Sequence, residues 1–256
     1  MKFLKRLSPE AVVCVWLLAW VALYGLLPAV LGAGFADAAR VLAEGASALV
    51  LLAPALREGS LPPQEGRGRP RYALAAAVLL PVLLAAYVAS QAFCLVGSTP
   101  YYGDPEVLLG EGTYVWYVLR TCVTAPVMEE LGCRWLAFGK LRRLGVGFWP
   151  AALASALLFS LIHVETNPAV SVAVIPSALL YCLMYDLTGS PWLGMASHAA
   201  RNLISLPGTP WAGSGLDALL DGLMYGVPKD VAVLALLAAT ATAVLLCACR
   251  DRLFRR

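Results

Sequence analysis

The stretch TAPVMEELGCRWLAF, residues 124–138, places two adjacent glutamates and an arginine inside an otherwise apolar run. Glu129 and Glu130 lie near its centre, and Arg134 follows four residues after the second glutamate. A lone charge at the centre of a membrane helix costs on the order of 3 kcal/mol or more, so such residues are rare and usually functional. Pro126 adds a second irregularity, because it removes one helix hydrogen bond and is expected to loosen the turn before Glu129.

The rest of the chain has the composition of an integral membrane protein. Of its 256 residues, 60% are hydrophobic and 14% are charged, whereas soluble domains carry about 25% charged residues. Apolar runs of about 20 residues are long enough to cross a hydrocarbon core of about 30 Å as helices. We predict an all-α bundle of about eight transmembrane spans, at residues 11–31, 37–56, 73–97, 114–138, 149–165, 169–187, 191–206 and 229–249.

The distribution of charge predicts how the bundle is organised. A loop rich in proline, glycine and charge, residues 57–71, divides an N-terminal two-span hairpin with its cytoplasmic loop (1–72) from a core that includes the C-terminal span (73–256). Lysines and arginines cluster before the first span and after the second, fourth and eighth, which all lie on one side of an eight-span bundle. Because cytoplasmic loops are rich in these residues, we expect both termini to be cytoplasmic and the protein to lie in the inner membrane.

Two other features narrow the class of partner. The net charge of +3 is spread over loops and both ends without a basic stripe, which argues against nucleic acid and leaves the lipid bilayer as the expected surroundings. The seven cysteines are scattered through apolar segments without the spacing of a zinc site or a disulfide framework. We interpret them as small buried side chains.

Few ionisable residues are expected at membrane depth, and both histidines of the protein are among them. The set is Arg120, Glu129, Glu130, Arg134, His163, His198 and Arg201, with Asn202 as a notable amide. Arg120 lies near the outer end of its span and is expected to extend to the membrane interface. Arg201 should point about 100° away from its neighbour Asn202, either lining a cavity rim or pairing with an acid.

The spacing of these residues predicts which side chains share a helix face. Glu130 and Arg134 are four residues apart and can pair, which leaves Glu129 rotated by about 100° toward a different neighbour. His198 and Asn202 have the same spacing and should project from one face of the seventh span.

Phe159 and His163 form a third pair of this kind on the fifth span. Counted at 1.5 Å per residue from the cytoplasmic end of each span, Glu129, His163 and His198 all lie at a depth of about 14–20 Å. We therefore expect these three groups to meet in one layer of the bundle.

A carboxylate, two imidazoles and an amide in a dry cavity suit amide hydrolysis. A glutamate and a histidine that bind the same water can remove its proton as it attacks a carbonyl, which is general base catalysis. A second histidine with an amide on its face can donate hydrogen bonds to the resulting oxyanion. The combination needs no covalent intermediate.

Three short motifs carry a resemblance to a known family. The segments EELGCR (129–134), FSLIH (159–163) and HAARN (198–202) resemble the motifs EExxxR, FxxxH and HxxxN of the CAAX prenyl protease and bacteriocin-processing (CPBP or ABI) family of glutamic intramembrane endopeptidases. Their order and spacing agree with that family over about residues 114–206. The resemblance implies that spans four to seven form the catalytic core.

The same resemblance implies a role for each motif residue. Glu129 would be the catalytic base and His163 would help to bind the nucleophilic water. His198 and Asn202 would stabilise the oxyanion, and Glu130 with the motif arginine would form a supporting ion pair. No metal or other cofactor belongs to this scheme.

The chain departs from the family pattern around the motif arginine, and this bears on substrate. Many members have an aromatic residue before that arginine and a glycine after it, whereas this chain has Cys133 and Trp135. Relatives cleave prenylated C-terminal motifs, leader peptides or C-terminal sorting tails. A composition biased toward alanine, leucine and arginine is typical of a high-GC bacterium, which favours a leader peptide or a sorting tail as the membrane-associated substrate.

Two alternatives stay open at the level of sequence. One glutamate and two histidines are also a possible zinc ligand set with water in the fourth place, although there is no HExxH pair. A non-enzymatic transporter or scaffold with a buried polar relay would use the same residue types.

Overall fold

The computed structural model describes residues 30, 36–58, 72–96, 113–163, 168–204, 206 and 227–254. Within these residues every regular element is a helix, which confirms the all-α prediction. The first predicted span, 11–31, lies outside the described residues except for residue 30, and most of the loops at 57–71 and 206–222 do so as well. The proposed division at residue 72 therefore stays a prediction.

From 37–56 onward each predicted span corresponds to described helices, although several ends differ, as at 138 against Arg143 and 165 against Leu161. Five consecutive segments form one unbroken rod, residues 113–143, which we call the motif helix: α6 (Thr113–Leu119), η3 (Arg120–Thr124), α7 (Ala125–Glu129), η4 (Glu130–Phe138) and α8 (Gly139–Arg143). The other helices are α3 (Ala36–Glu58), α4 (Tyr72–Val96), α9 (Phe148–Leu161), α10 (Pro168–Ala173), α11 (Ile175–Thr188), α12 (Trp192–Ile204), α14 (Lys229–Ala248) and α15 (Arg250–Phe254).

Several of these helices have the length and surface of membrane spans. Among the described residues, three helical stretches are both long and apolar enough to cross a membrane: Tyr72–Cys94, Ala169–Thr188 and Lys229–Ala248. The outer face of α14 carries large apolar side chains, with Leu234, Leu237 and Leu245 each at least 60% exposed. Such a surface suits contact with lipid tails rather than water.

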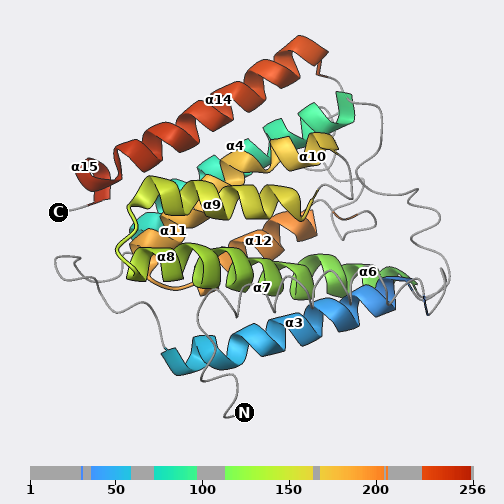
Figure 1. Ribbon diagram of the computed structural model, residues 1–256. Coiled ribbons are helices and arrows are strands. Elements are labelled where there is room, and N and C mark those ends of the chain that lie inside the picture. Colours follow the sequence, from blue (N-terminus) through green and yellow to red (C-terminus); the bar gives the residue numbers. More distant parts are fainter. Residues whose placement is uncertain are drawn as a thin grey trace.

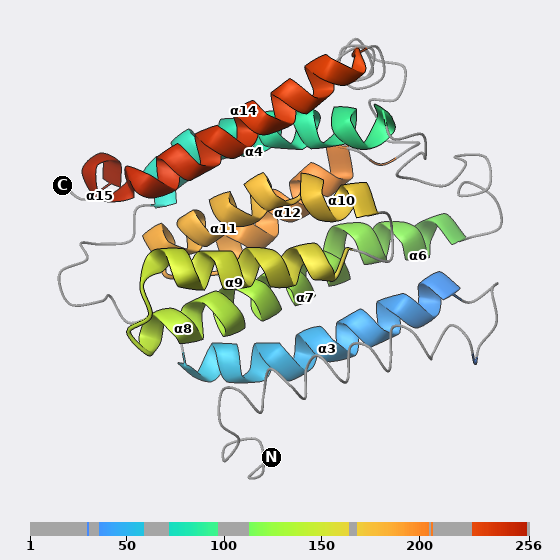
Figure 2. The ribbon, with the colours of Figure 1, turned by 45° about the horizontal axis from the view of Figure 1, so that its top comes forward.

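The helices form a bundle with the motif helix near one side (Figures 1 and 2). Helix α14 packs along α4, helix α3 packs along the motif helix, and α9, α11 and α12 lie between these two pairs. The C-terminal ends of α8 and α11 meet α15 at one end of the bundle (Figure 1). There Arg142 Nε lies 3.2 Å from Asp186 Oδ1, and Arg250 Nε lies 3.7 Å from Asp186 Oδ2.

Small residues allow α9 to approach the motif helix closely. Ala151, Ala152 and Ser155 are fully buried, and the Ser155 hydroxyl donates to the Cys133 carbonyl at 2.7 Å. This is the small-residue packing expected between membrane helices. At the end of α11, Gly189 adopts a left-handed conformation (φ 69°), which stops the helix before α12 begins.

Candidate active site

The motif helix is not a regular α-helix around the two glutamates. Two π-helical segments, η3 and η4, flank the five-residue segment α7, so that Glu129 ends α7 and Glu130 begins η4. The Ala125 N–H donates to the Arg120 carbonyl, five residues back, and Pro126 follows directly. The turn before Pro126 is therefore widened, as its missing N–H predicts, and such π segments are frequent at functional sites.

The predicted pairing of Glu130 with Arg134 is confirmed. Arg134 Nη1 lies 3.3 Å from Glu130 Oε1, and both side chains are 1% exposed. The guanidinium also lies 4.2 Å from the centroid of the Phe159 ring and 5.1 Å from that of Tyr181. Helix α12 comes so close at Gly194 that a Cβ there would meet Glu130 Oε2 at 3.0 Å. The ion pair and the close approach of α12 hold the Glu130 carboxylate, and the two aromatic rings hold the guanidinium that pairs with it.

His198 lies between the two glutamates. Its Nδ1 is 3.2 Å from Glu130 Oε1, and its Nε2 is 3.8 Å from Glu129 Oε2. The ring stacks on Tyr181, with centroids 5.3 Å apart and planes inclined by 24°. The structure thus brings together two helices, α12 and the motif helix, through one buried imidazole.

His163 lies just beyond the end of α9. The predicted span 149–165 extends too far, because α9 ends at Leu161 and His163 is in the turn that follows. Its Nδ1 is 2.7 Å from the Phe159 carbonyl oxygen. Since a carbonyl only accepts, Nδ1 is the donor, and Nε2 of the neutral ring carries the lone pair.

Phe159 connects this histidine to the rest of the cluster. Its ring centroid lies 4.6 Å from that of His163 and 5.9 Å from that of His198. Phe159 therefore lies beside both histidines, and His198 in turn lies 3.8 Å from Glu129, from Nε2 to Oε2.

Asn202 is held by two neighbours. Its Nδ2 donates to the Thr121 carbonyl of the motif helix at 2.8 Å, and its Oδ1 accepts from Nε and Nη2 of Arg201, both at 3.2 Å. The expectation that Arg201 points away from Asn202 is wrong. The long Arg201 side chain folds back onto the amide, and its guanidinium lies 5.3 Å from the centroid of the Tyr87 ring of α4.

Sequence reasoning missed a buried carboxylate beside the motif helix. Glu44 of α3 is buried, and it accepts a hydrogen bond from Thr124 Oγ1 at 2.7 Å and pairs with Arg120 Nε at 3.3 Å. Arg120 therefore binds an acid inside the bundle instead of only extending to the interface. The rule that selected Glu129 would have found Glu44, because it too is an acid within a predicted span, and the same holds for Asp186.

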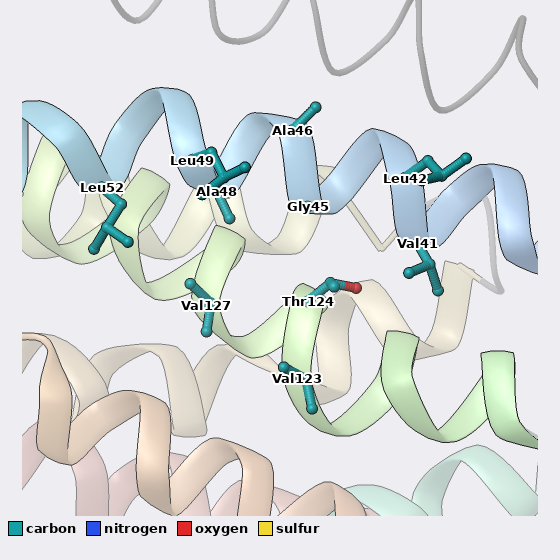
Figure 3. Close-up of a pocket in the computed structure, with 10 residues that line it drawn as sticks. All are labelled: Val41, Leu42, Gly45, Ala46, Ala48, Leu49, Leu52, Val123, Thr124 and Val127. Atoms are coloured by element: carbon teal, nitrogen blue, oxygen red, sulfur yellow. The ribbon is translucent and has the colours of Figure 1, made fainter.

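An apolar groove of about 540 Å³ lies between α3 and the motif helix (Figure 3). Ala48 and Leu52 of α3 and Val127 of the motif helix are among its lining residues, and Thr124 lines it beside the Glu44 hydrogen bond. The groove is thus on the side of the motif helix that faces α3.

The family comparison agrees with the motifs. Residues 111–204 match the family model described as type II CAAX prenyl endopeptidase Rce1-like. The similarity to this family thus covers the segment that carries the three motifs. The matched segment runs from the motif helix to the end of α12 and includes all seven motif residues, and the family implies intramembrane protease activity of the CAAX type. No curated protein and no solved structure matches the chain.

The zinc alternative was tested on the ligand geometry. Among the described residues, no group of three or more histidine, cysteine, aspartate or glutamate side chains is arranged to hold a metal ion. Glu129 contacts one histidine at 3.8 Å, while His163 directs its Nδ1 to a backbone carbonyl. The Nδ1 bond of His163 leaves its Nε2 lone pair available, so chelator treatment is the experiment that decides between zinc and the metal-free scheme.

Proposed function

We propose that this Rce1-like protein is a glutamic intramembrane endopeptidase in which Glu129 activates water to hydrolyse a peptide bond of a membrane-associated substrate. One observation carries the proposal. The buried Glu129 Oε2 has no hydrogen-bond partner among the described residues and faces His198 Nε2 at 3.8 Å, whereas Glu130 is held through its Oε1 by both Arg134 and His198. A weakly compensated carboxylate at membrane depth costs stability. Such residues are therefore rare and usually mark a functional site.

Glu129 and Nε2 of His163 are the groups of the cluster that can accept hydrogen bonds from a water molecule, and the proposed hydrolysis starts from that water. A water bound between Glu129 and Nε2 of His163 loses a proton to the carboxylate as its oxygen forms a bond to the substrate carbonyl carbon. The carbonyl oxygen becomes an oxyanion. When the C–N bond breaks, the leaving amine takes up the proton that Glu129 received, and the products are an acid and an amine.

His198 and Asn202 are the proposed donors to the oxyanion. Because the Glu130 carboxylate accepts from Nδ1, Nε2 of His198 donates to the oxyanion only when the ring is an imidazolium, a form that the two flanking glutamates favour. Nε2 faces Glu129, so a carbonyl attacked beside Glu129 would meet that edge of the ring. Donors that are already fixed in a site of low dielectric act strongly on a developing negative charge. Glu130 and Arg134 support this arrangement by holding His198 at Nδ1.

For the substrate we propose a bacterial leader peptide or a C-terminal sorting tail. The composition of the chain supports a bacterial source, where such peptides are commoner than prenylated ones. For the location we propose the inner membrane with both termini in the cytoplasm. The basic residues at the joint end of α8 and α15, including Arg142 and Arg250, support that orientation.

Purified protein in liposomes provides the test. An apolar C-terminal tail peptide and a farnesylated CAAX peptide serve as separate probes, with cleavage followed by mass spectrometry in H2(18)O. We expect the tail peptide to be cut, one ¹⁸O atom in the new carboxylate, and no cleavage by His163→Ala. Exclusive cleavage of the farnesylated peptide would contradict the substrate proposal, and full activity of His163→Ala would contradict the mechanism.

A further inference from the structure

The Thr121 carbonyl of the motif helix is left without a helical donor. In an α-helical turn its donor would be the Ala125 N–H, but that group donates to Arg120. In a π-helical turn its donor would be residue 126, which is a proline and has no N–H. An unpaired backbone carbonyl inside a membrane bundle is costly, so another donor is expected there.

Asn202 supplies that partner from another helix. Its Nδ2 donates to the Thr121 oxygen at 2.8 Å, in place of the main-chain N–H that Pro126 lacks. Asn202 is 8% exposed, and its bond to Thr121 is partly buried between the two helices. Pro126 thereby couples the helix that carries the glutamates to the helix that carries the HxxxN motif.

Arg201 fixes the other end of the same amide. Its Nε and Nη2 both donate to Asn202 Oδ1 at 3.2 Å. A guanidinium can only donate and a carbonyl can only accept, so the amide oxygen must face Arg201 and the amide nitrogen must face Thr121. The reversed amide would mismatch both partners, and the orientation of Asn202 is therefore unique.

We propose that Arg201 and the Thr121–Pro126 turn form a cradle that orients the amide of Asn202, which makes Arg201 and Pro126 positioning residues. The amide nitrogen carries two N–H donors, so the bond to Thr121 sets the direction of the second one. The effect of the cradle on turnover rests on the proposed role of Asn202 toward the oxyanion. The cradle itself does not, and the two claims are tested by different measurements.

A stability cycle tests the cradle without any activity. In Pro126→Ala, an N–H at residue 125 or 126 can donate to the Thr121 carbonyl. The hydrogen bond from Asn202 Nδ2 is then no longer needed to pair that carbonyl. We expect Asn202→Ala to lower the Tm in detergent by roughly 3–8 °C when Pro126 is present and by less than half as much in the Pro126→Ala background. An equal loss in both backgrounds would overturn the cradle.

If Pro126→Ala does not fold, a second cycle replaces it. Arg201→Met and Asn202→Ala each remove one partner of the same amide bond, so their Tm losses should not add in the double variant. If the Tm losses of the two single variants add in the double variant, the proposal that Arg201 orients Asn202 is wrong.

Turnover then tests whether the cradle serves the reaction. Arg201→Lys keeps the positive charge but loses the two-pronged donor, so we expect kcat to fall about 10- to 100-fold with KM within about twofold. Arg252→Lys, on the exposed α15, is the matched control and should keep the wild-type kcat.

The outcomes separate the two claims. Coupling in the stability cycle with normal cleavage by both Arg201→Lys and Asn202→Ala would keep the cradle and remove Asn202 from the mechanism. Loss of cleavage by Asn202→Ala but not by Arg201→Lys would overturn Arg201 as a positioning residue.

Discussion

Replacing Arg134 by methionine removes the cation that pairs with Glu130 inside the bundle. The pair is separated by 3.3 Å and both side chains are 1% exposed, so Glu130 would be left as a buried charge without its guanidinium partner, with His198 Nδ1 at 3.2 Å as a remaining donor. Breaking a buried ion pair in this way costs about 3–5 kcal/mol. Methionine keeps the volume of the apolar part of the side chain, so cavity formation contributes little.

The magnitude can be measured as a shift in Tm. For a chain of this size, 1 kcal/mol corresponds to about 2–4 °C, so Arg134→Met should lower the Tm by roughly 6–20 °C. The double variant Glu130→Gln with Arg134→Met removes the unpaired charge as well and should recover part of this loss. Arg252→Met, in an exposed part of α15, is the control and should shift the Tm by little.

Differential scanning fluorimetry in detergent, with monodispersity checked by size exclusion, is a sufficient assay. A Tm of Arg134→Met within the range of the Arg252→Met control would refute the reasoning, because it would mean that Glu130 does not depend on its partner. A double variant that is less stable than Arg134→Met would refute it as well.

Three further predictions concern neighbouring features. Glu44→Ala leaves Arg120 and Thr124 without their acceptor and should destabilise the protein by about 2–4 kcal/mol, while Glu44→Gln should lose less; equal losses in thermal unfolding would contradict this. Gly194→Ala places a Cβ 3.0 Å from Glu130 Oε2, so it should cost about 1–3 kcal/mol, and a Tm equal to wild type would show that the carboxylate can move freely. Cleavage should resist a strong zinc chelator; loss of activity that added zinc restores would support the metal alternative instead.

The positions of the helices and one ion pair follow from local rules. Apolar runs of the length of a membrane span gave the helices, since in lipid the backbone must bond within its own segment. Glu130 and Arg134 were predicted to pair because four residues bring side chains to one face, and the widened π segment that contains them preserves this proximity. His163 was placed in a helix because its motif has the same spacing, but α9 ends two residues earlier.

Contacts made by long side chains and by distant segments did not follow from those rules. The direction of its Cα–Cβ bond predicts that Arg201 points away from Asn202, its neighbour in sequence. The long side chain instead folds back along the helix and donates to the Asn202 amide. Glu44 lies 76 residues from Arg120, and nothing in the local spacing connects them. The hydrogen bond from Asn202 to the Thr121 carbonyl also could not be predicted. It depends on the π-helical hydrogen-bond pattern before Pro126 and on how α12 packs against the motif helix.

The adjacent glutamates allow the central claim to be tested with matched variants. Glu129→Gln and Glu130→Gln are isosteric changes at neighbouring positions, and both kcat and Tm can be measured on the same preparations. The account predicts that Glu129→Gln abolishes cleavage while its Tm stays near that of wild type, and that Glu130→Gln lowers the Tm because Arg134 and His198 lose a charged partner. Wild-type cleavage by Glu129→Gln would contradict the assignment of Glu129 as the base that activates water.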